Sequence, residues 1–364
     1  MIWMGVPILV TLFLQAAGTC NSAVRSVAVL PSTPVAERRQ AFEQSIRDCP
    51  NDLELYIGYV SLLISGREYS SALGWIAKGL TIAPGNQDLL LRQAAILRAL
   101  GDPEASLKVL LHLPASSELC FQSGLDYRAL NKHDAARKSL AAAWEMGFQD
   151  PYTLYALIDE EHALGDKSAG MKHFQLFMER FPDSPWLHVL LGNAYLEKKR
   201  NGEARQEYLE ALRRDSALPS VNFLVGYLAY QGEQYGTAAD YFRKEIAVNP
   251  AFADASLFLG ESLRQLGRME DAIAPLRQAL VLNPRSALAY ATLGTVLAQT
   301  GRLQDATEIL EKGEKNFPSD LTFPAQLSRI FARLDRKEDA RREAERYRSM
   351  MGSKESAAPL VAKP

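Results

Sequence analysis

The chain has 364 residues, of which 47% are hydrophobic and 23% are charged, and its formal net charge is −2. These values are typical of a soluble globular protein of two or three domains, and the balanced charge argues against a nucleic-acid binder. Three cysteines are too few for a disulfide scaffold or a four-thiolate zinc site, so we expect no metal or other cofactor.

The N-terminal stretch, residues 1–18, is apolar and ends in Ala16-Ala17-Gly18. An apolar run that ends in small residues is typical of a signal peptide, and this one is short for a membrane-spanning helix of ~20 residues. We therefore expect an exported protein, in the periplasm or another extracytoplasmic compartment, with an uncleaved membrane anchor as the alternative. The absence of any Asn-x-Ser/Thr sequence favours a bacterial origin.

Cys20 follows this stretch and raises the question of lipid attachment. Bacterial lipoprotein signals carry an aliphatic residue and then small residues before the cysteine, whereas here Ala17 and Thr19 stand at those places. We therefore expect an unmodified Cys20. Cys49 and Cys120 are 71 residues apart, and a disulfide requires Cα atoms within ~7 Å, so two separate buried cysteines are favoured over a bridge between them.

The rest of the chain divides into four segments. We expect residues 19–34 to be flexible and residues 35–49 to form an amphipathic helix that caps the segment after it. Residues 50–352 repeat with a fixed period. Residues 353–364 are aperiodic, which is typical of a disordered tail.

The repeat has a period of 34 residues, and it is carried by small residues, glycines and prolines. The small residues are Ala136, Gly170, Ala204, Ala238, Ala272, Ala306 and Ala340. Glycines stand twelve positions earlier, at Gly124, Gly192, Gly226, Gly260 and Gly294, and prolines recur at Pro182, Pro250, Pro284 and Pro318. The weakest repeat, near residues 87–116, is shortened.

Each unit is predicted to contain two helices. In one unit, Leu263 belongs to a first apolar helical stripe and Leu276 to a second, and Gly267 separates the two. A glycine inside a helix costs ~1 kcal/mol relative to alanine, so its recurrence needs a reason in packing. We expect Gly260 and Ala272 to let the paired helices approach closely.

This pattern resembles the tetratricopeptide repeat, in which a large residue, Leu-Gly, an aromatic, Ala and Pro recur at fixed places. The motif is matched at Leu191-Gly192, Tyr195 and Ala204, and again at Leu259-Gly260, Ala272 and Pro284; departures are Ser216, Gly313 and Ser328. The resemblance implies an all-α protein, an α-solenoid wound as a right-handed superhelix of about nine units. It also implies a non-catalytic scaffold that binds segments of other proteins or peptides in a concave groove.

In this family the groove is lined by side chains two, five, nine and twelve residues into each unit. The resemblance assigns these places to Trp186, Val189, Asn193, Phe223, Tyr227, Tyr230, Leu257, Glu261 and Arg264. Chaperone-binding members hold a C-terminal carboxylate with a Lys at the fifth place and an Asn at the ninth. Here Val189 stands at the fifth place before Asn193, and Phe223 and Tyr227 stand at the two places of the next unit, so the pair is not present. A chaperone-tail receptor is therefore disfavoured.

No motif points to catalysis or to metal binding. The densest acidic cluster is Asp159-Glu160-Glu161-His162, which we interpret as a solvated helix end rather than a metal or acid–base site. Arginines of the last repeat alternate with glutamates, which is typical of a solvated helix with ion pairs; contact with an anionic membrane or partner is the alternative.

Two other functions stay open: a membrane-anchored, lipoprotein-like assembly factor of envelope or pilus biogenesis, and, more remotely, an enzyme.

Overall fold

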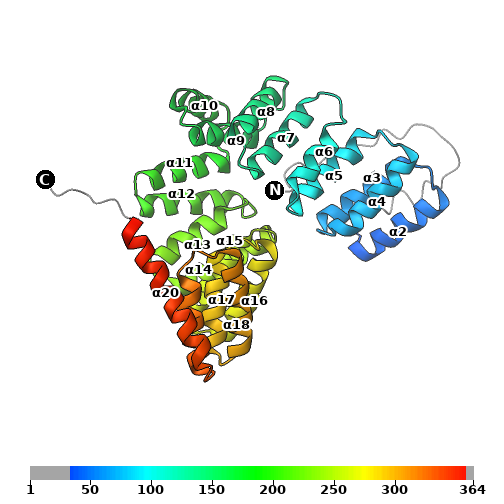
Figure 1. Ribbon diagram of the computed structural model, residues 1–364. Helices are drawn as coiled ribbons and strands as arrows, with labels where there is room; N and C mark the ends of the chain where they lie inside the picture. Colours follow the sequence, from blue (N-terminus) through cyan, green and yellow to red (C-terminus); the bar gives the residue numbers. More distant parts are fainter. Residues whose placement is uncertain (1–32, 358–364) are drawn as a thin grey trace. The chain divides into compact units, whose positions relative to one another are not determined.

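The computed structural model describes the backbone of residues 33–357 and the side chains of residues 33–351. Over this part of the chain it has nineteen helices and no strand. The first is α2 (Val35–Asp48), and the next eighteen form nine consecutive pairs (Figure 1). The predicted signal peptide, Cys20 and most of the segment expected to be flexible, residues 19–34, therefore lie outside the described residues.

Each pair consists of a first and a second helix joined by a short turn. The first helices are α3 (Leu53–Ser65), α5 (Gln87–Ala99), α7 (Ser117–Ala129), α9 (Pro151–Ala163), α11 (Pro185–Glu197), α13 (Val221–Gln231), α15 (Ala253–Gln265), α17 (Ala287–Gln299) and α19 (Thr322–Arg333). The second helices are α4 (Tyr69–Ile82), α6 (Pro103–Leu110), α8 (His133–Glu145), α10 (Lys167–Arg180), α12 (Asn201–Arg214), α14 (Tyr235–Val248), α16 (Met269–Leu282), α18 (Leu303–Asn316) and α20 (Lys337–Ala357). The prediction of an all-α solenoid of about nine units is confirmed.

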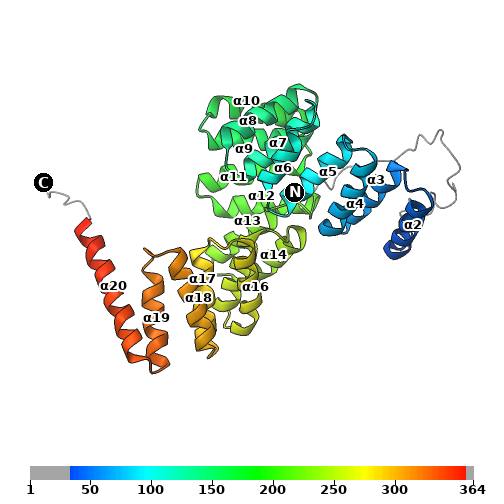
Figure 2. The same ribbon diagram turned by 45° about the vertical axis from the view of Figure 1, so that its right-hand side comes forward.

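The chain forms two compact units, and the division falls inside α11, between Leu187 and His188. In the first unit, α2 packs against α3 (Figure 2), and a core gathers around buried residues such as Leu63 and Ile76. In the second unit, the core runs from α13 to α19 around Phe242, Leu276, Leu310 and Phe323. Two units replace the two or three domains that length suggests, and both are built from the same repeat.

The recurrent glycines face a large side chain on the paired helix. A Cβ built on Gly260 would lie 2.5 Å from Cγ of Leu276, and one on Gly294 would lie 2.5 Å from Cγ of Leu310. Gly124, Gly192 and Gly226 meet Leu140, Tyr208 and Phe242 in the same way, always sixteen residues further along. The expected close approach is confirmed, and its reason is the space that this side chain needs.

The other repeat positions lie in the seams and turns. Ala204, Ala238, Ala272 and Ala306 are fully buried on the second helices. Pro284 and Pro318 lie in the turns that follow α16 and α18, where a residue without an N–H costs no helical hydrogen bond. Gly267 has a φ of +76° between α15 and α16, which glycine adopts without strain.

Two segments differ in length from the regular pair. Within the shortened repeat near residues 87–116, α6 has 8 residues, and Pro114 soon after it prevents its continuation. At the other end, α20 continues to Ala357, so the prediction of a disordered tail from residue 353 is wrong for residues 353–357. No proline interrupts the sequence there before Pro359, and the helix continues. Residues 358–364 lie outside the described part.

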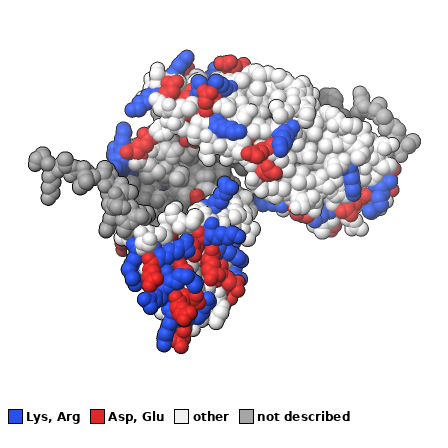
Figure 3. All heavy atoms as spheres, in the orientation of Figure 1, with Lys and Arg blue, Asp and Glu red and all other residues white. Residues whose placement is uncertain are grey.

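Arginines of the last pair are mostly balanced by acids. Arg336 pairs with Asp339 at 2.6 Å, Arg341 with Glu345 at 2.9 Å, and an Arg346 nitrogen lies 2.7 Å from a carboxylate oxygen of Glu314. Basic and acidic atoms are interleaved over the C-terminal helices in Figure 3. The expected ion pairs are therefore present on α20.

The cysteines correct one expectation. Cys49 is buried but disulfide-bonded, whereas Cys120 is a half-buried free thiol whose pKa is raised by burial. The prediction that Cys49 and Cys120 are not bridged to each other is confirmed. The prediction of two buried cysteines is corrected, because Cys120 is only half-buried and Cys49 takes part in a disulfide. The Cys120 sulfur lies 3.9 Å from the sulfur of Met146.

Candidate partner-binding site

The first helices of the second unit lie beside one another, and each has one side that faces away from the second helix of its own pair. We call this side the inner face. Consecutive first helices α13, α15, α17 and α19 are in contact. Two polar contacts join them directly: the Tyr230 hydroxyl donates to Glu261 on the next first helix, and Arg333 Nη1 donates to the Ala298 carbonyl oxygen at 2.8 Å.

Four aromatic rings gather where α13 meets α15, and two of them, Phe223 and Phe258, also contact the buried Phe242 of α14. Phe223 and Tyr227 are stacked with centroids 5.9 Å apart, and Phe258 of α15 meets the edges of Tyr227 and Tyr230 at 5.2 and 5.5 Å. All four rings are half-buried. We call this group the aromatic patch; aromatic residues that keep an accessible surface are common anchors for protein partners.

Glu261 is the polar centre beside the patch. Its carboxylate accepts hydrogen bonds from Arg264 at 2.6 Å, from Gln265 at 3.0 Å and from Tyr230 at 3.3 Å. Burial alone would raise the pKa of this carboxyl, but these hydrogen bonds and the Arg264 charge outweigh it and hold the pKa below its ordinary value. The network fixes the Tyr230 ring at the rim of the patch.

Five of the nine residues implied by the resemblance therefore come together in the second unit: Phe223, Tyr227, Tyr230, Glu261 and Arg264. Sequence reasoning missed Phe258, which stands one place from the expected register. The signal that could have marked it is a pair of phenylalanines, Phe252 and Phe258, that follows two helices rich in aromatic residues.

Two other implied residues, Val189 and Leu257, do not line an open surface, and a third, Asn193, is half-buried. Val189 is 2% exposed and Leu257 is 5% exposed, and Leu257 belongs to the core of the second unit. Asn193 accepts a hydrogen bond of 2.7 Å from the Tyr208 hydroxyl, within its own helical pair. The expectation that these side chains line the groove is wrong for Val189 and Leu257, because neighbouring helices cover them.

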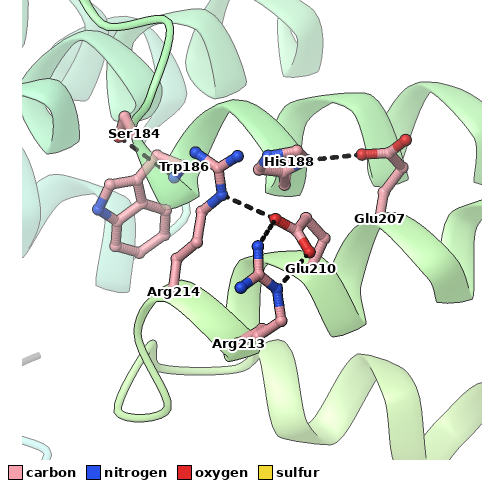
Figure 4. Close-up of polar contacts among 7 residues, drawn as sticks. All are labelled: Ser184, Trp186, His188, Glu207, Glu210, Arg213 and Arg214. Carbon is pink, nitrogen blue, oxygen red and sulfur yellow. Dashed lines mark hydrogen bonds and ion pairs between the residues drawn. The ribbon is translucent and has the colours of Figure 1, made fainter.

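Trp186 belongs to the first unit, where it packs on α9. Its ring lies 4.8 Å from Tyr152 and 4.5 Å from Tyr155. The Trp186 amide donates to the Ser184 hydroxyl, the contact of a helix N-cap (Figure 4). The first unit thus has an aromatic cluster of its own, of which sequence reasoning found one member.

Helix α12 carries ion pairs on its accessible side. The His188 ring of α11 lies 2.8 Å from a Glu207 oxygen, and Glu210 pairs with Arg213 and Arg214 (Figure 4). The hydrogen bonds from Arg213 and Arg214 lower the pKa of Glu210 to about 2. The two arginines are exposed, the other three groups are half-buried, and all five satisfy one another, so they stabilise α12.

The acidic cluster of α9 is not a solvated helix end. Glu160 and Glu161 are 3% and 2% exposed, and they contact His133 at 2.8 Å and His173 at 2.7 Å. The prediction failed because these partners come from α8 and α10, which no local pattern reveals. Over the described residues there is neither a group of three or more potential metal ligands nor a helix able to cross a membrane.

Known proteins share this architecture. Residues 155–219, 225–287 and 271–321 match the family model of the tetratricopeptide repeat. No curated protein matches the chain. The crystal structure of the APC/C hetero-tetramer Cut9–Hcn1 is similar with a TM-score of 0.52 at 18% identity, and the match covers 84% of this chain and 62% of that one. The chain thus spans less than two thirds of that relative.

Structures of MamA also match, each across about half of the chain. One MamA protein has a TM-score of 0.47 at 19% identity, covering 50% of this chain and 100% of that one. MamA from Desulfovibrio magneticus RS-1 has a TM-score of 0.44 at 22% identity, covering 48% and 98%. Nine helical pairs, the 34-residue period and the matched family model agree. The chain therefore carries tetratricopeptide repeats, and these are the repeats of a protein-interaction scaffold.

Proposed function

We propose that the chain is a non-catalytic scaffold that binds a segment of another protein on the inner face of its second unit. The observation that carries the proposal is the aromatic patch, a group of four half-buried rings of which one, Tyr230, is bonded to the carboxylate network of Glu261. Tyr227 and Tyr230 each combine a large apolar face with a polar tip, as residues that anchor partner segments commonly do.

Two features support a binding rather than a catalytic role. Repeats occupy the described chain from Leu53 to Ala357, so the inner face is built from the same elements that form the core. The charged groups beside the patch are bonded to one another, since Glu261 already accepts from three side chains. Such a carboxylate positions its neighbours better than it transfers protons.

The test removes the accessible rings while keeping the helices. In the variant Y227A/Y230A we expect crosslinked partner capture from the native organism to fall about tenfold or more, since anchoring aromatics dominate binding energy. Y241A, which removes a half-buried ring on the second helix α14, is the matched control and should capture normally. Circular dichroism checks that both variants keep their helices. An unchanged capture profile in Y227A/Y230A would refute the proposal.

For the compartment, we propose export through residues 1–18. The disulfide at Cys49 supports this, because disulfides persist mainly outside the cytosol. The mass of the mature N-terminus tests it: a chain beginning at Thr19 is expected. A diacylglyceryl group on Cys20 would instead support the lipoprotein-like assembly factor, and an intact residue 1 would exclude cleavage.

A further inference from the structure

Two arginines of α19 face away from the core of the second unit. The buried residues of α19 are Phe323, Pro324, Leu327, Ile330 and Phe331. Arg329 and Arg333 are exposed, and a spacing of four residues puts them on the same side of the helix. Arg333 reaches the Ala298 carbonyl oxygen on α17, so this side belongs to the inner face.

Within residues 33–351, whose side chains the structure describes, these two charges have no acidic partner. Arg333 bonds only that carbonyl oxygen, and Arg329 forms no hydrogen bond or ion pair with any residue that the structure describes. Neither α17 nor α19 contains an Asp or a Glu. Most arginines of the last pair differ: Arg341 and Arg346 on α20 and Arg336 just before it contact carboxylates, whereas Arg348 has no such contact among the described residues.

The acids nearby are already engaged. Glu261 on α15 is bonded to Arg264, Gln265 and Tyr230. Of the two aspartates that flank α19, Asp320 accepts the Thr322 amide at 2.9 Å, and Asp335 pairs with Lys337 at 3.4 Å. Among the residues whose side chains the structure describes, no carboxylate is therefore paired with Arg329 or Arg333.

The neighbouring helix leaves room over this charge. On α17 the places that follow Leu257, Glu261 and Arg264 by 34 residues hold Ala291, Thr295 and Ala298, whose side chains are small; Ala291 and Ala298 are each 8% exposed. The Thr295 hydroxyl donates to the Ala291 carbonyl of its own helix at 2.9 Å, so it offers no free donor. Between the aromatic patch and the two arginines there is thus a floor of small, neutral side chains.

We infer that the inner face of the second unit binds an acidic segment of a protein partner. Carboxylates of the segment pair with Arg329 and Arg333, because the guanidinium fork matches a carboxylate in geometry. A large apolar side chain of the same segment packs on the aromatic patch. The inference rests on the proposed function and specifies the chemistry of its partner.

The spacing of the two contacts sets the length of the segment. Packed helices are 8–10 Å apart, so the two steps from α15 to α19 span about 16–20 Å. An extended chain covers ~3.3 Å per residue, and the apolar anchor and the first acid should therefore be about five or six residues apart. A peptide supplies both chemistries along one line, which a lipid surface or a nucleic-acid backbone does not.

The test uses the full chain and three fluorescein-labelled peptides. The acidic probe has a Trp, a four-residue Gly-Ser spacer and four alternating Glu and Asp. A neutral twin carries Gln and Asn instead, and a basic twin carries Lys. Affinity is measured by fluorescence anisotropy at low and at high salt, together with binding to phosphatidylserine vesicles. The variants are R329Q/R333Q and, as a control with the same loss of charge, R341Q/R348Q on α20.

We expect the acidic probe to bind about tenfold more tightly than the neutral twin, and to weaken several-fold as salt screens the contact. R329Q/R333Q should abolish this preference, and R341Q/R348Q should keep it. R329Q alone, which breaks no contact among the described residues, should lower affinity without changing the melting temperature.

Three results would overturn the inference: no binding of the acidic probe up to about 1 mM, equal affinity for the neutral twin, or arginine-dependent binding of vesicles alone. The proposed function fails by a different result. If the neutral twin binds as tightly as the acidic probe and Y227A/Y230A loses both, the scaffold stands and the acidic preference falls; if Y227A/Y230A captures partners normally, the scaffold itself falls.

Discussion

The Asp126 carboxylate is fully buried where three helices of the first unit meet. It accepts a hydrogen bond of 2.6 Å from Ser106 on α6 and pairs at 3.0 Å with Arg98 on α5. Burial raises the pKa of Asp126 above its ordinary value, although Arg98 and Ser106 oppose that shift. Such a pair is needed for stability as a whole, because removing either residue would leave the other charge buried without a partner.

Truncating this acid should therefore be costly. We expect D126A to lower the free energy of unfolding of the first unit by about 3–5 kcal/mol, because Arg98 is left without its counter-charge. The apolar replacement R98M/D126L should cost much less. Urea unfolding followed by circular dichroism measures both. A D126A variant within about 1 kcal/mol of the wild type would contradict the assignment.

Two glutamates of the second unit have pKa shifts of opposite sign. The pKa of Glu261 is lowered by its donors. Glu245 is fully buried on α14 and accepts the amides of Ser220 at 2.8 Å and Phe223 at 3.3 Å. Burial nevertheless raises the pKa of Glu245. Glu245 thus caps the start of α13 from 25 residues away in the sequence, beyond the reach of any local motif.

These shifts predict opposite pH dependences. A lowered folded-state pKa adds stability above the unfolded value of 4.5 and loses it as the pH falls, so the wild type should lose stability relative to E261Q in acid. A raised folded-state pKa adds stability below 4.5 and loses it as the pH rises, so the difference between wild type and E245Q should shrink towards neutral pH. Urea unfolding from pH 3.5 to 7 measures both differences. Parallel curves for the two variants would contradict this.

At the scale of the element, the packing of a pair depends on the glycine of its first helix. Gly260 leaves the space that Leu276 fills, and Gly294 does so for Leu310. The sequence predicted both the glycines and their role, because a costly residue recurred at one register. It did not identify the side chain that fills the space, since this requires the angle at which the two helices cross.

Substitution of these glycines should separate packing from helix propensity. We expect G260A to destabilise the second unit by about 1–3 kcal/mol, because the new Cβ overlaps Leu276 and this outweighs the gain in propensity. G74A in α4, where no atom lies within 4 Å of the new Cβ, should be neutral or stabilising. In the L276A background G260A should cost little. Thermal and urea unfolding test all three, and equal effects of G260A and G74A would refute the packing argument.

At the scale of the whole molecule, stability is distributed along a stack. Helical pairs contact mainly the pairs next to them, and the two compact units have separate cores. In such proteins stability is close to a sum of repeat and neighbour terms. A local defect should therefore remain local.

Hydrogen exchange measured by mass spectrometry tests this locality. In D126A we expect faster exchange in α5–α8 and wild-type exchange in α15–α18, and in G260A the reverse. The double variant should lose the sum of the two free energies, because the sites share no partner. Uniformly faster exchange in either single variant would show that the stack opens as one cooperative body.

The sequence by itself determined the class, the period and the number of repeats, because each unit repeats the same local requirements for helix, turn and seam. The resemblance to the tetratricopeptide repeat also implied that Tyr227, Tyr230 and Glu261 belong to one surface of the stack. Tertiary structure alone decided which of them stay accessible: Leu257 is covered, Phe258 joins the patch, and Glu160 and Glu161 are buried against histidines. The physical reason is that spacing fixes direction, whereas burial and pairing depend on neighbouring helices many residues away.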